Sequence, residues 1–191
     1  VERTLIHAKR LGAVIPDRIQ TERLMLRPWV FEDLGDVLLY ATDEEWGRFL
    51  PLPQPYGEED ARRFVATQVL LDWHKHSSWA IEHQGSVLGG INLRLLSGGR
   101  IGEMGYSIAR SHWRRGFATE AARAVVNSAF HSCPDLLKVR AMADARNQAS
   151  MRVLEKIGMQ REGVLRLNRL NHGQLVDEVW YGLLRSEWAA D

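Results

Sequence analysis

The sequence predicts an α/β fold of the α+β type, with about seven strands and about four helices in one domain. The chain has 191 residues, which is enough for one buried core and too few for two ordinary domains. Short apolar runs with strand character alternate with segments whose apolar residues recur at helical spacing. Turn residues alone separate some neighbouring runs, which is typical of antiparallel hairpins. We therefore expect a single domain over residues 1–191.

The first half of the chain is expected to contribute four strands and two helices after an N-terminal extension at residues 1–20. In the opening strand, apolar Leu24, Leu26 and Trp29 alternate with other residues, as in a half-buried strand. The pair Gln84–Gly85 turns the chain easily and predicts a hairpin. The expected elements are a strand at 21–29, a helix at 31–42, a loop near 50–57, a helix from 58 to about 76, hairpin strands at 78–83 and 86–96, and a strand at 101–109.

The second half is expected to contribute two helices and three strands, which complete a core spanning residues 21–188. The alanine-rich segment 116–131 contains no helix breaker before Pro134. Gly158 ends the following helix, and Asn171-His172-Gly173 has the composition of a turn. The expected elements are a helix at 116–131, a strand at 136–144, a helix at 148–157, and strands at 159–167 and 175–184.

Composition argues against several classes of partner. Lys plus Arg number 25 against 24 for Asp plus Glu, so we expect no nucleic acid and no anionic membrane surface as partner. No run approaches the roughly 20 apolar residues of a membrane span, and Lys9 and Arg10 interrupt a start that resembles neither signal peptide nor anchor.

Cys133 is the single cysteine, which fits a reducing, cytoplasmic setting. His74 and His76 lack the i, i+4 spacing of a helical metal site, so we expect no metal.

The junction between a predicted strand and the alanine-rich helix carries the strongest chemical signal. Arg114, Arg115 and Gly116 stand between the two elements. Backbone N–H groups at a helix start lack partners within the helix and lie at the positive end of its dipole, so they can bind anions. We predict a diphosphate site there, to which the two arginines add charge-assisted hydrogen bonds. The alternative is a capped surface helix with solvated arginines. The predicted backbone donors are Gly116, Phe117, Ala118 and Thr119.

Two sequence blocks follow a pattern known from one enzyme superfamily. The first is WRRGFATEA at residues 113–121, and the second is N-x-x-S from Asn147, followed by LEKIG. Together they resemble the GNAT acetyltransferases, in particular the RimJ/RimL-like branch, whose phosphate loop commonly reads WGKG, an aromatic residue, then ATEA. The resemblance runs from about Thr21 to Trp188. Arg114 replaces the first glycine of the pattern, and a positive φ at that position would strain the loop.

The resemblance implies a sheet geometry and a cofactor. The sheet would be strongly bent, mixed and mostly antiparallel, and its fourth and fifth strands, at 101–109 and 136–144, would splay apart. The cofactor would be acetyl-CoA, with CoA as product, and its pantetheine arm would enter the gap and pair with the backbone of the fourth strand. The Asn147 side chain would also bond the pantetheine. The implied backbone partners are Tyr106, Ser107 and Ile108.

The resemblance also suggests how the acetyl group reaches an amine. Several superfamily members use a glutamate on the fourth strand as the base for the incoming ammonium, and Glu103 lies on that predicted strand. Its alternative role is a structural pair with an arginine. Ser150 would lie near the thioester sulfur and donate a proton to it, or would only stabilise the first helical turn. Many relatives have a tyrosine acid where this chain has Leu154, so water is the other proton source.

The acceptor is the part of the function that the sequence determines least. We expect an N-acetyltransferase that acts by direct attack in a ternary complex, first on a protein or peptide N-terminus. A small amine or aminoglycoside is an alternative, for which residues 43–45 offer the carboxylates. A CoA-binding module without catalysis, motivated by Leu154, is a third. In the closing hairpin, Arg166, Asp177 and Tyr181 are expected to line the acceptor cleft or to form a structural pair, and the resemblance also allows a homodimer.

Overall fold

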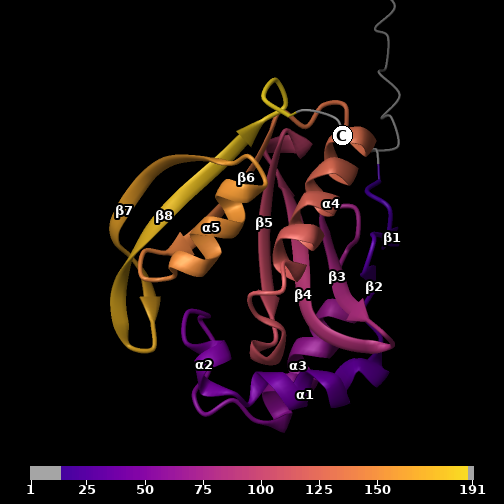
Figure 1. Cartoon of the computed structure of the whole chain (residues 1–191), viewed down its shortest axis with the longest axis vertical. Helices are drawn as coiled ribbons and strands as arrows, with labels where there is room; N and C mark the ends of the chain where they lie inside the picture. The colour runs from indigo at the N-terminus through magenta and orange to yellow at the C-terminus, as the bar shows by residue number, and fades with distance from the viewer. Residues whose placement is uncertain (1–13, 189–191) are drawn as a thin grey trace, which may run out of the picture.

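A computed structural model describes residues 14–188, which form an eight-stranded sheet with helices on both faces (Figure 1). The strand order is β1-β2-β3-β4-β5-β6-β8-β7, and every neighbouring pair is antiparallel except β5 with β6. This confirms the predicted mixed, mostly antiparallel sheet. Residues 1–13 of the expected N-terminal extension lie outside the described residues. The strands are β1 (Ile19–Gln20), β2 (Met25–Pro28), β3 (His76–His83), β4 (Ser86–Leu96), β5 (Ile101–Ile108), β6 (Lys138–Asp144), β7 (Gln160–Asn171) and β8 (Gln174–Leu184).

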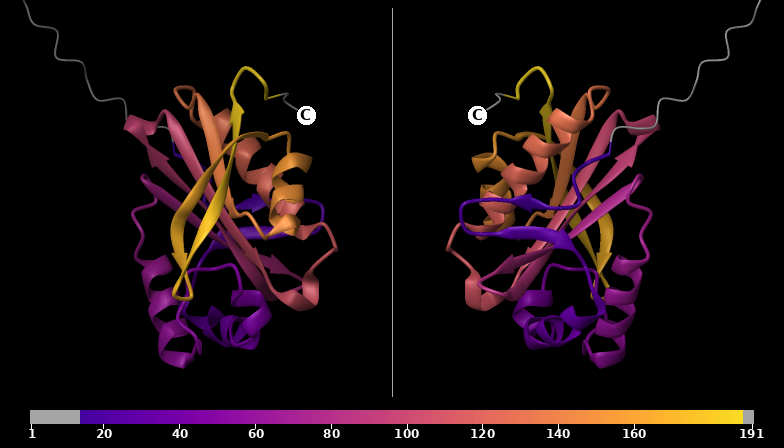
Figure 2. Two further views of the ribbon diagram at one scale, coloured as in Figure 1. Left: turned by 90° about the vertical axis from the view of Figure 1, so that its left-hand side faces the viewer. Right: turned by 90° about the vertical axis from the view of Figure 1, so that its right-hand side faces the viewer.

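The described part of the chain contains five α-helices, which divide between the two faces of the sheet (Figure 2). Helices α4 and α5 pack on one face, while α1 and α3 pack on the other. Within residues 14–188, no helix has the length and apolar character needed to span a membrane. The helices are α1 (Leu34–Ala41), α2 (Glu44–Gly47), α3 (Glu58–Val69), α4 (Phe117–Ser132) and α5 (Gln148–Lys156), and 3-10 turns occupy Phe31–Asp33, Ser97–Gly99 and Arg110–His112.

The central strands bury both faces because each face has its own apolar core. On β3, Trp79 and Ile81 are fully buried in the core beneath α4 and α5, whereas Ala80 between them belongs to the core beneath α1 and α3. Successive side chains of a strand point to opposite faces, so one strand can supply both cores. The larger core also contains Phe117, the first residue of α4. The start of this helix is therefore anchored by burial.

Four local features differ from the sequence prediction. The helix expected from 58 to about 76 ends at Val69, because the chain turns over residues 70–75 and β3 begins at His76. The short helix α2 was not predicted, and neither was β1, whose two residues pair with β2 and bring the strand number to eight. Strand β7 continues to Asn171, beyond the expected end at residue 167.

Strands β5 and β6 separate halfway along their length. They pair in parallel from Ile101–Lys138 to Met104–Ala141, and the register stops there. Beyond that point, β5 pairs only with β4 and β6 pairs only with β8. Figure 1 shows the β7–β8 hairpin diverging from β5 along this stretch. The predicted splay of the fourth and fifth strands of the core is therefore confirmed.

Candidate active site

The loop that follows β5 ends at the N-terminus of α4. Gly116 is the N-cap residue with φ of 82°, a left-handed conformation that glycine adopts without steric cost. The Glu120 N–H donates to the Gly116 carbonyl, 3.0 Å between nitrogen and oxygen, so the N–H groups of residues 117–119 precede the helical hydrogen bonds. Residues 114–116 are exposed. This helix end thus has the open geometry that an anion site requires.

The residue that replaces the first glycine of the family pattern adopts a strained conformation. Arg114 has φ of 61°, in the left-handed region that side chains rarely enter. The arginine therefore occupies a backbone conformation that glycine would adopt without this cost. The guanidinium of the neighbouring Arg115 lies 5.0 Å from the centre of the Phe117 ring. Both predicted arginines thus lie within a few residues of the open helix end.

The gap between β5 and β6 is crossed by one pair of hydroxyl groups. Tyr106 lies on β5 and Ser150 in the first turn of α5, and their side-chain oxygens are 2.9 Å apart. The Tyr106 hydroxyl also lies 3.1 Å from the Ser150 carbonyl oxygen, to which it can donate. Burial raises the pKa of Tyr106, and the bond to Ser150 only partly opposes this. The phenol therefore keeps its proton at neutral pH and can serve as a hydrogen-bond donor.

The remaining predicted pantetheine contacts lie around the same gap. Asn147 caps α5, because its Oδ1 accepts from the Ser150 N–H at 3.0 Å. This leaves the Asn147 Nδ2 without a hydrogen bond to any residue within 14–188. Ser107 lines the cleft described below. Ile108 is buried, and its carbonyl accepts from the Trp113 indole at 2.6 Å, which fixes the turn out of β5.

A cleft of about 500 Å³ opens on the face of the sheet that carries α1 and α3. Its floor is formed by β3, β4 and β5 and includes His76, Asn92 and Glu103. The far wall comes from β6, the start of α5, and Arg169 of β7. Much of the lining is aromatic and includes Trp29, Tyr40, Trp46, Phe49, Tyr56 and Phe64. Both residues of the hydroxyl pair, Tyr106 and Ser150, also line the cleft, so the cleft and the strand gap are continuous.

Glu103 occupies the cleft floor between two arginines. His76, Arg94, Glu103 and Arg140 form one row across strands β3 to β6. The Arg94 Nη2 lies 2.7 Å from one carboxylate oxygen of Glu103, and the Arg140 Nη2 lies 2.7 Å from the other. Both oxygens are therefore engaged, and an incoming ammonium would have to displace or join a guanidinium. This arrangement matches the alternative role of Glu103 that the sequence left open.

The family model described as the acetyltransferase (GNAT) domain matches residues 23–160, which is well over half of the chain. The chain belongs to the GNAT acetyltransferase family. Its relatives include the uncharacterized N-acetyltransferase YoaA of Bacillus subtilis (strain 168), 32% identical over 171 residues, covering 87% of this chain and 96% of YoaA. YdaF of the same strain is 28% identical over 174 residues, covering 87% of this chain and 92% of YdaF. It is named a candidate ribosomal N-acetyltransferase, which agrees with the RimJ/RimL-like resemblance.

Solved GNAT structures share the fold. The acetyltransferase of the GNAT family from Bacillus anthracis superposes with a TM-score of 0.80 at 28% identity, covering 89% of this chain and 99% of its own. RimL, solved with coenzyme A, superposes with a TM-score of 0.79 at 19% identity, covering 93% of this chain and 99% of its own, which shows the fold alone. As a GNAT acetyltransferase, the protein uses acetyl-CoA as its acetyl donor. The open start of α4 and the gap between β5 and β6 are the features that fit this donor.

The closing hairpin of this GNAT enzyme contributes a different residue from those expected. Tyr181 is buried and donates to the Glu155 carboxylate at 3.0 Å, and Asp177 accepts from the backbone N–H of Leu167 at 2.8 Å. Neither lines the cleft, and Arg166 does not line it either. Arg169 does, and its guanidinium donates to the Phe49 carbonyl at 3.2 Å. The hairpin thus closes one side of the cleft by holding the segment after α2.

Sequence reasoning also missed several polar groups on the cleft. His76 was considered only as a metal ligand, yet it lines the cleft, and its buried Nε2 has no hydrogen-bond partner among the described residues. Burial and the nearby Arg94 lower the pKa of His76, which the hydrogen bond with Asn92 only partly opposes. The Trp46 Nε1 is likewise buried without a partner in that part of the chain. Spacing along the sequence gave no sign of these positions, because the cleft is assembled from many elements that lie far apart in the chain.

Proposed function

We propose that this GNAT enzyme acetylates the α-amine of a protein or peptide N-terminus, by direct attack on acetyl-CoA in a ternary complex. The observation that carries the proposal is that the acidic groups of the cleft are paired with arginines. Glu103 and Asp144 are the carboxylates on the lining, and arginines hold both. Burial opposes ionisation of Asp144, but hydrogen bonds from Arg146 outweigh it and lower its pKa. The cleft therefore favours an acceptor with one amine and an uncharged neighbouring group.

The aromatic lining of the cleft supports the same acceptor class. The six aromatic side chains named above offer apolar surface for the first residue of a peptide. A peptide supplies one α-amine beside the side chain of that residue, with no further positive charge required for binding. The name of the relative YdaF points to ribosomal proteins as substrates of that enzyme. A ribosomal or other protein N-terminus is accordingly the acceptor we propose here, with the enzyme acting in the cytoplasm.

A polycationic acceptor such as an aminoglycoside is less well supported. Such a molecule needs clustered, unpaired carboxylates, and residues 43–45 were the sequence candidates. These residues do not line the main cleft. Asp43 caps α2 and lies 3.5 Å from the Arg110 guanidinium, and Glu45 pairs with Arg48 at 3.2 Å. The structure thus leaves few free anionic groups for several amines.

The proposed transfer replaces a carbon–sulfur bond by a carbon–nitrogen bond. The acceptor ammonium first gives one proton to a base, its nitrogen attacks the thioester carbonyl carbon, and the carbon–sulfur bond breaks. The nitrogen then loses a second proton and the thiolate gains one. We assign the diphosphate to the start of α4 and the pantetheine to the β5 backbone and the Asn147 Nδ2. Ser150, held by Tyr106, is the proposed proton donor to sulfur. Glu103 stays the candidate base, in competition with its two arginines.

The test is acetyl transfer from acetyl-CoA to a panel of acceptors, read by mass spectrometry. The panel contains peptides that differ in the first residue, the same peptides with a blocked α-amine and a free internal lysine, simple amines, and an aminoglycoside. We expect acetylation of free α-amines only, and Ser150→Ala should lower turnover without loss of CoA binding. Acetylation of the lysine or the aminoglycoside alone would refute the proposed acceptor.

The same panel tests the alternative that the protein binds CoA but no longer catalyses acetyl transfer. Leu154 is fully buried where many relatives have a tyrosine, which motivated the idea of a CoA-binding module. Saturable CoA binding without acetylation of any acceptor would favour that module over the enzyme.

Glu103→Gln tests the base in the same assay. If Glu103 accepts the proton, the variant loses turnover most at mildly acidic pH, whereas an unchanged pH profile ends its candidacy.

We also propose that the enzyme forms a homodimer. Strand β7 is the edge of the sheet, and its residues 160–168 are exposed along their whole length. Leu165, Leu167 and Leu170 are 47%, 63% and 61% exposed, and an exposed apolar edge strand favours association. Light scattering should give twice the chain mass, and replacement of Leu167 by aspartate should return the monomer. A monomeric wild-type protein would refute this assembly.

A further inference from the structure

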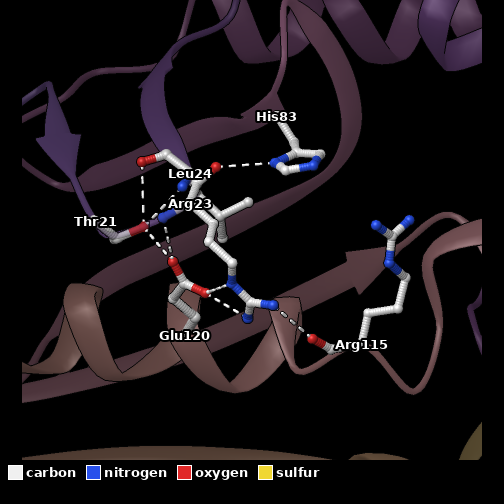
Figure 3. A network of polar contacts seen from close by, with 6 residues as sticks. All are labelled: Thr21, Arg23, Leu24, His83, Arg115 and Glu120. Atoms are coloured by element: carbon white, nitrogen blue, oxygen red, sulfur yellow. Dashed lines mark hydrogen bonds and ion pairs between the residues drawn. The ribbon is translucent and has the colours of Figure 1, made fainter.

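We propose that Arg23 and Glu120 form a clamp that holds the diphosphate loop in its binding conformation, an inference that rests on the cofactor site proposed at the start of α4. Arg23 precedes β2, and Glu120 lies in the first turn of α4. Their side chains meet beside the loop, as Figure 3 shows. Neither residue is among the groups assigned above to the cofactor. Both are positioning residues, which act on the cofactor through the loop.

Glu120 is held by an unusually complete set of donors. Its Oε1 accepts from the Thr21 hydroxyl at 2.6 Å and from the Arg23 backbone N–H at 2.9 Å. Its Oε2 accepts from the Arg23 Nε at 2.7 Å and pairs with the Arg23 Nη2 at 2.6 Å. Burial opposes ionisation of Glu120, but these bonds from Thr21 and Arg23 outweigh it and lower its pKa. The carboxylate is thus charged and fixed at neutral pH.

Arg23 links the fixed carboxylate of Glu120 to the diphosphate loop. Its Nη1 donates to the carbonyl oxygen of Arg115 at 3.0 Å (Figure 3). Its guanidinium carbon lies 4.6 Å from the centre of the Phe117 ring. A Cβ added at Gly116 would lie 3.3 Å from the Arg23 Nη2. One side chain therefore contacts the loop carbonyl, the N-cap residue and the first helical residue.

The loop needs an external constraint because its own backbone is strained. Arg114 and Gly116 both have positive φ, 61° and 82°, and Arg115 lies between them. A non-glycine residue in this region tends to relax toward negative φ. The hydrogen bond from Arg23 holds the Arg115 carbonyl on the side of Glu120. The clamp therefore opposes the relaxation that would turn the loop N–H groups away from a bound diphosphate.

Because Glu120 is negatively charged, one variant can distinguish a positioning role from a direct electrostatic effect on CoA binding. A carboxylate near the start of α4 repels a bound diphosphate, so its removal would strengthen CoA binding if only charge mattered. If the carboxylate instead holds Arg23 and the loop in place, its removal weakens CoA binding. The two accounts predict opposite signs for one variant, Glu120→Gln.

The experiment measures the dissociation constant of CoA by calorimetry for Arg23→Gln, Glu120→Gln and the double variant. We expect each single variant to raise the dissociation constant on the order of tenfold, as loss of charge-assisted hydrogen bonds predicts. The double variant should be no weaker than either single one, because both break the same clamp. Turnover at saturating acetyl-CoA should stay close to wild type. The matched control is Arg62→Gln, which breaks the exposed Arg62–Glu58 pair on α3 and should leave CoA binding unchanged.

Three results would overturn the clamp. Tighter CoA binding by Glu120→Gln would show that its charge alone matters, and unchanged binding would show that the loop does not depend on this carboxylate. Full rescue by Arg23→Lys would assign Arg23 a direct charge contact, because lysine keeps the charge but lacks the fork that reaches both Glu120 and the Arg115 carbonyl. Additive losses in the double variant would show two independent sites. Absence of CoA binding in the wild-type protein is a different result, since it removes the proposed cofactor site itself and the clamp with it.

Discussion

Replacing Arg114 by glycine should stabilise the protein, although it removes a side chain. Arg114 has φ of 61°, and its side chain makes no hydrogen bond or ion pair with the residues that the structure describes. The substitution therefore removes backbone strain without breaking a contact. Glycine enters this region freely and is the residue that the family pattern places there.

The magnitude follows from two opposing terms. A left-handed conformation costs a non-glycine residue about 1–2 kcal/mol, and glycine adds about 0.5–1 kcal/mol of unfolded-state entropy. The net stabilisation is therefore roughly 0.5–1 kcal/mol, which raises the unfolding midpoint by about 1–4 °C for a chain of this size. Arg114→Ala is the matched variant, because it also removes the guanidinium but keeps the strain. It should be roughly 0.5–1 kcal/mol less stable than Arg114→Gly.

Thermal and urea unfolding of the three proteins check this reasoning. The glycine variant should melt highest, and the alanine variant should melt close to wild type. Equal midpoints for glycine and alanine would refute the assignment of strain to Arg114. The same variants also separate charge from conformation in CoA binding, since both lack the guanidinium. If CoA binds more tightly to the glycine variant than to the alanine variant, the loop conformation itself contributes to affinity.

Two further predictions concern residues on the cleft. Tyr106→Phe should lower turnover about tenfold, because the Ser150 hydroxyl loses its partner at 2.9 Å; unchanged turnover would show that Ser150 acts without it. His76 has a lowered pKa, so the folded protein binds fewer protons at this site than the unfolded chain, and stability falls as the pH drops below the ordinary histidine pKa of about 6.5. His76→Gln should therefore reduce the difference in unfolding midpoint between neutral and mildly acidic pH. Replacement of the exposed His74 should leave that difference unchanged. Equal pH dependence in the two variants would contradict the assignment of this effect to His76.

The features predicted correctly depend on residues close together in the chain. Helix α4 follows from an alanine-rich run after Gly116, and α5 follows from the helical segment that begins at Gln148 and is ended by Gly158. The β3–β4 hairpin follows from Gln84–Gly85 between two apolar runs. Caps, turns and alternation are decided within three or four residues. The family resemblance added the splay of β5 and β6, which no local pattern encodes.

The missed features depend on contacts between distant segments. The end of α3 at Val69 is decided by the start of β3 at His76, whose partner Arg94 lies on another strand. Glu103 can be placed on a strand from sequence, but its two arginines are found only once β4, β5 and β6 are aligned. For the same reason, no spacing rule revealed the cleft position of His76.

The sequence by itself determined most of the helices and strands, the glycine at the start of α4 and the family, because these are set by local backbone preferences and by a motif contiguous along the chain. Only the tertiary structure decided which side chains face one another: the hydroxyl pair of Tyr106 and Ser150, and the clamp of Arg23 and Glu120, which lie 97 residues apart in the chain. Such contacts depend on strand register and helix packing, which arise from burial of the whole core rather than from any short segment.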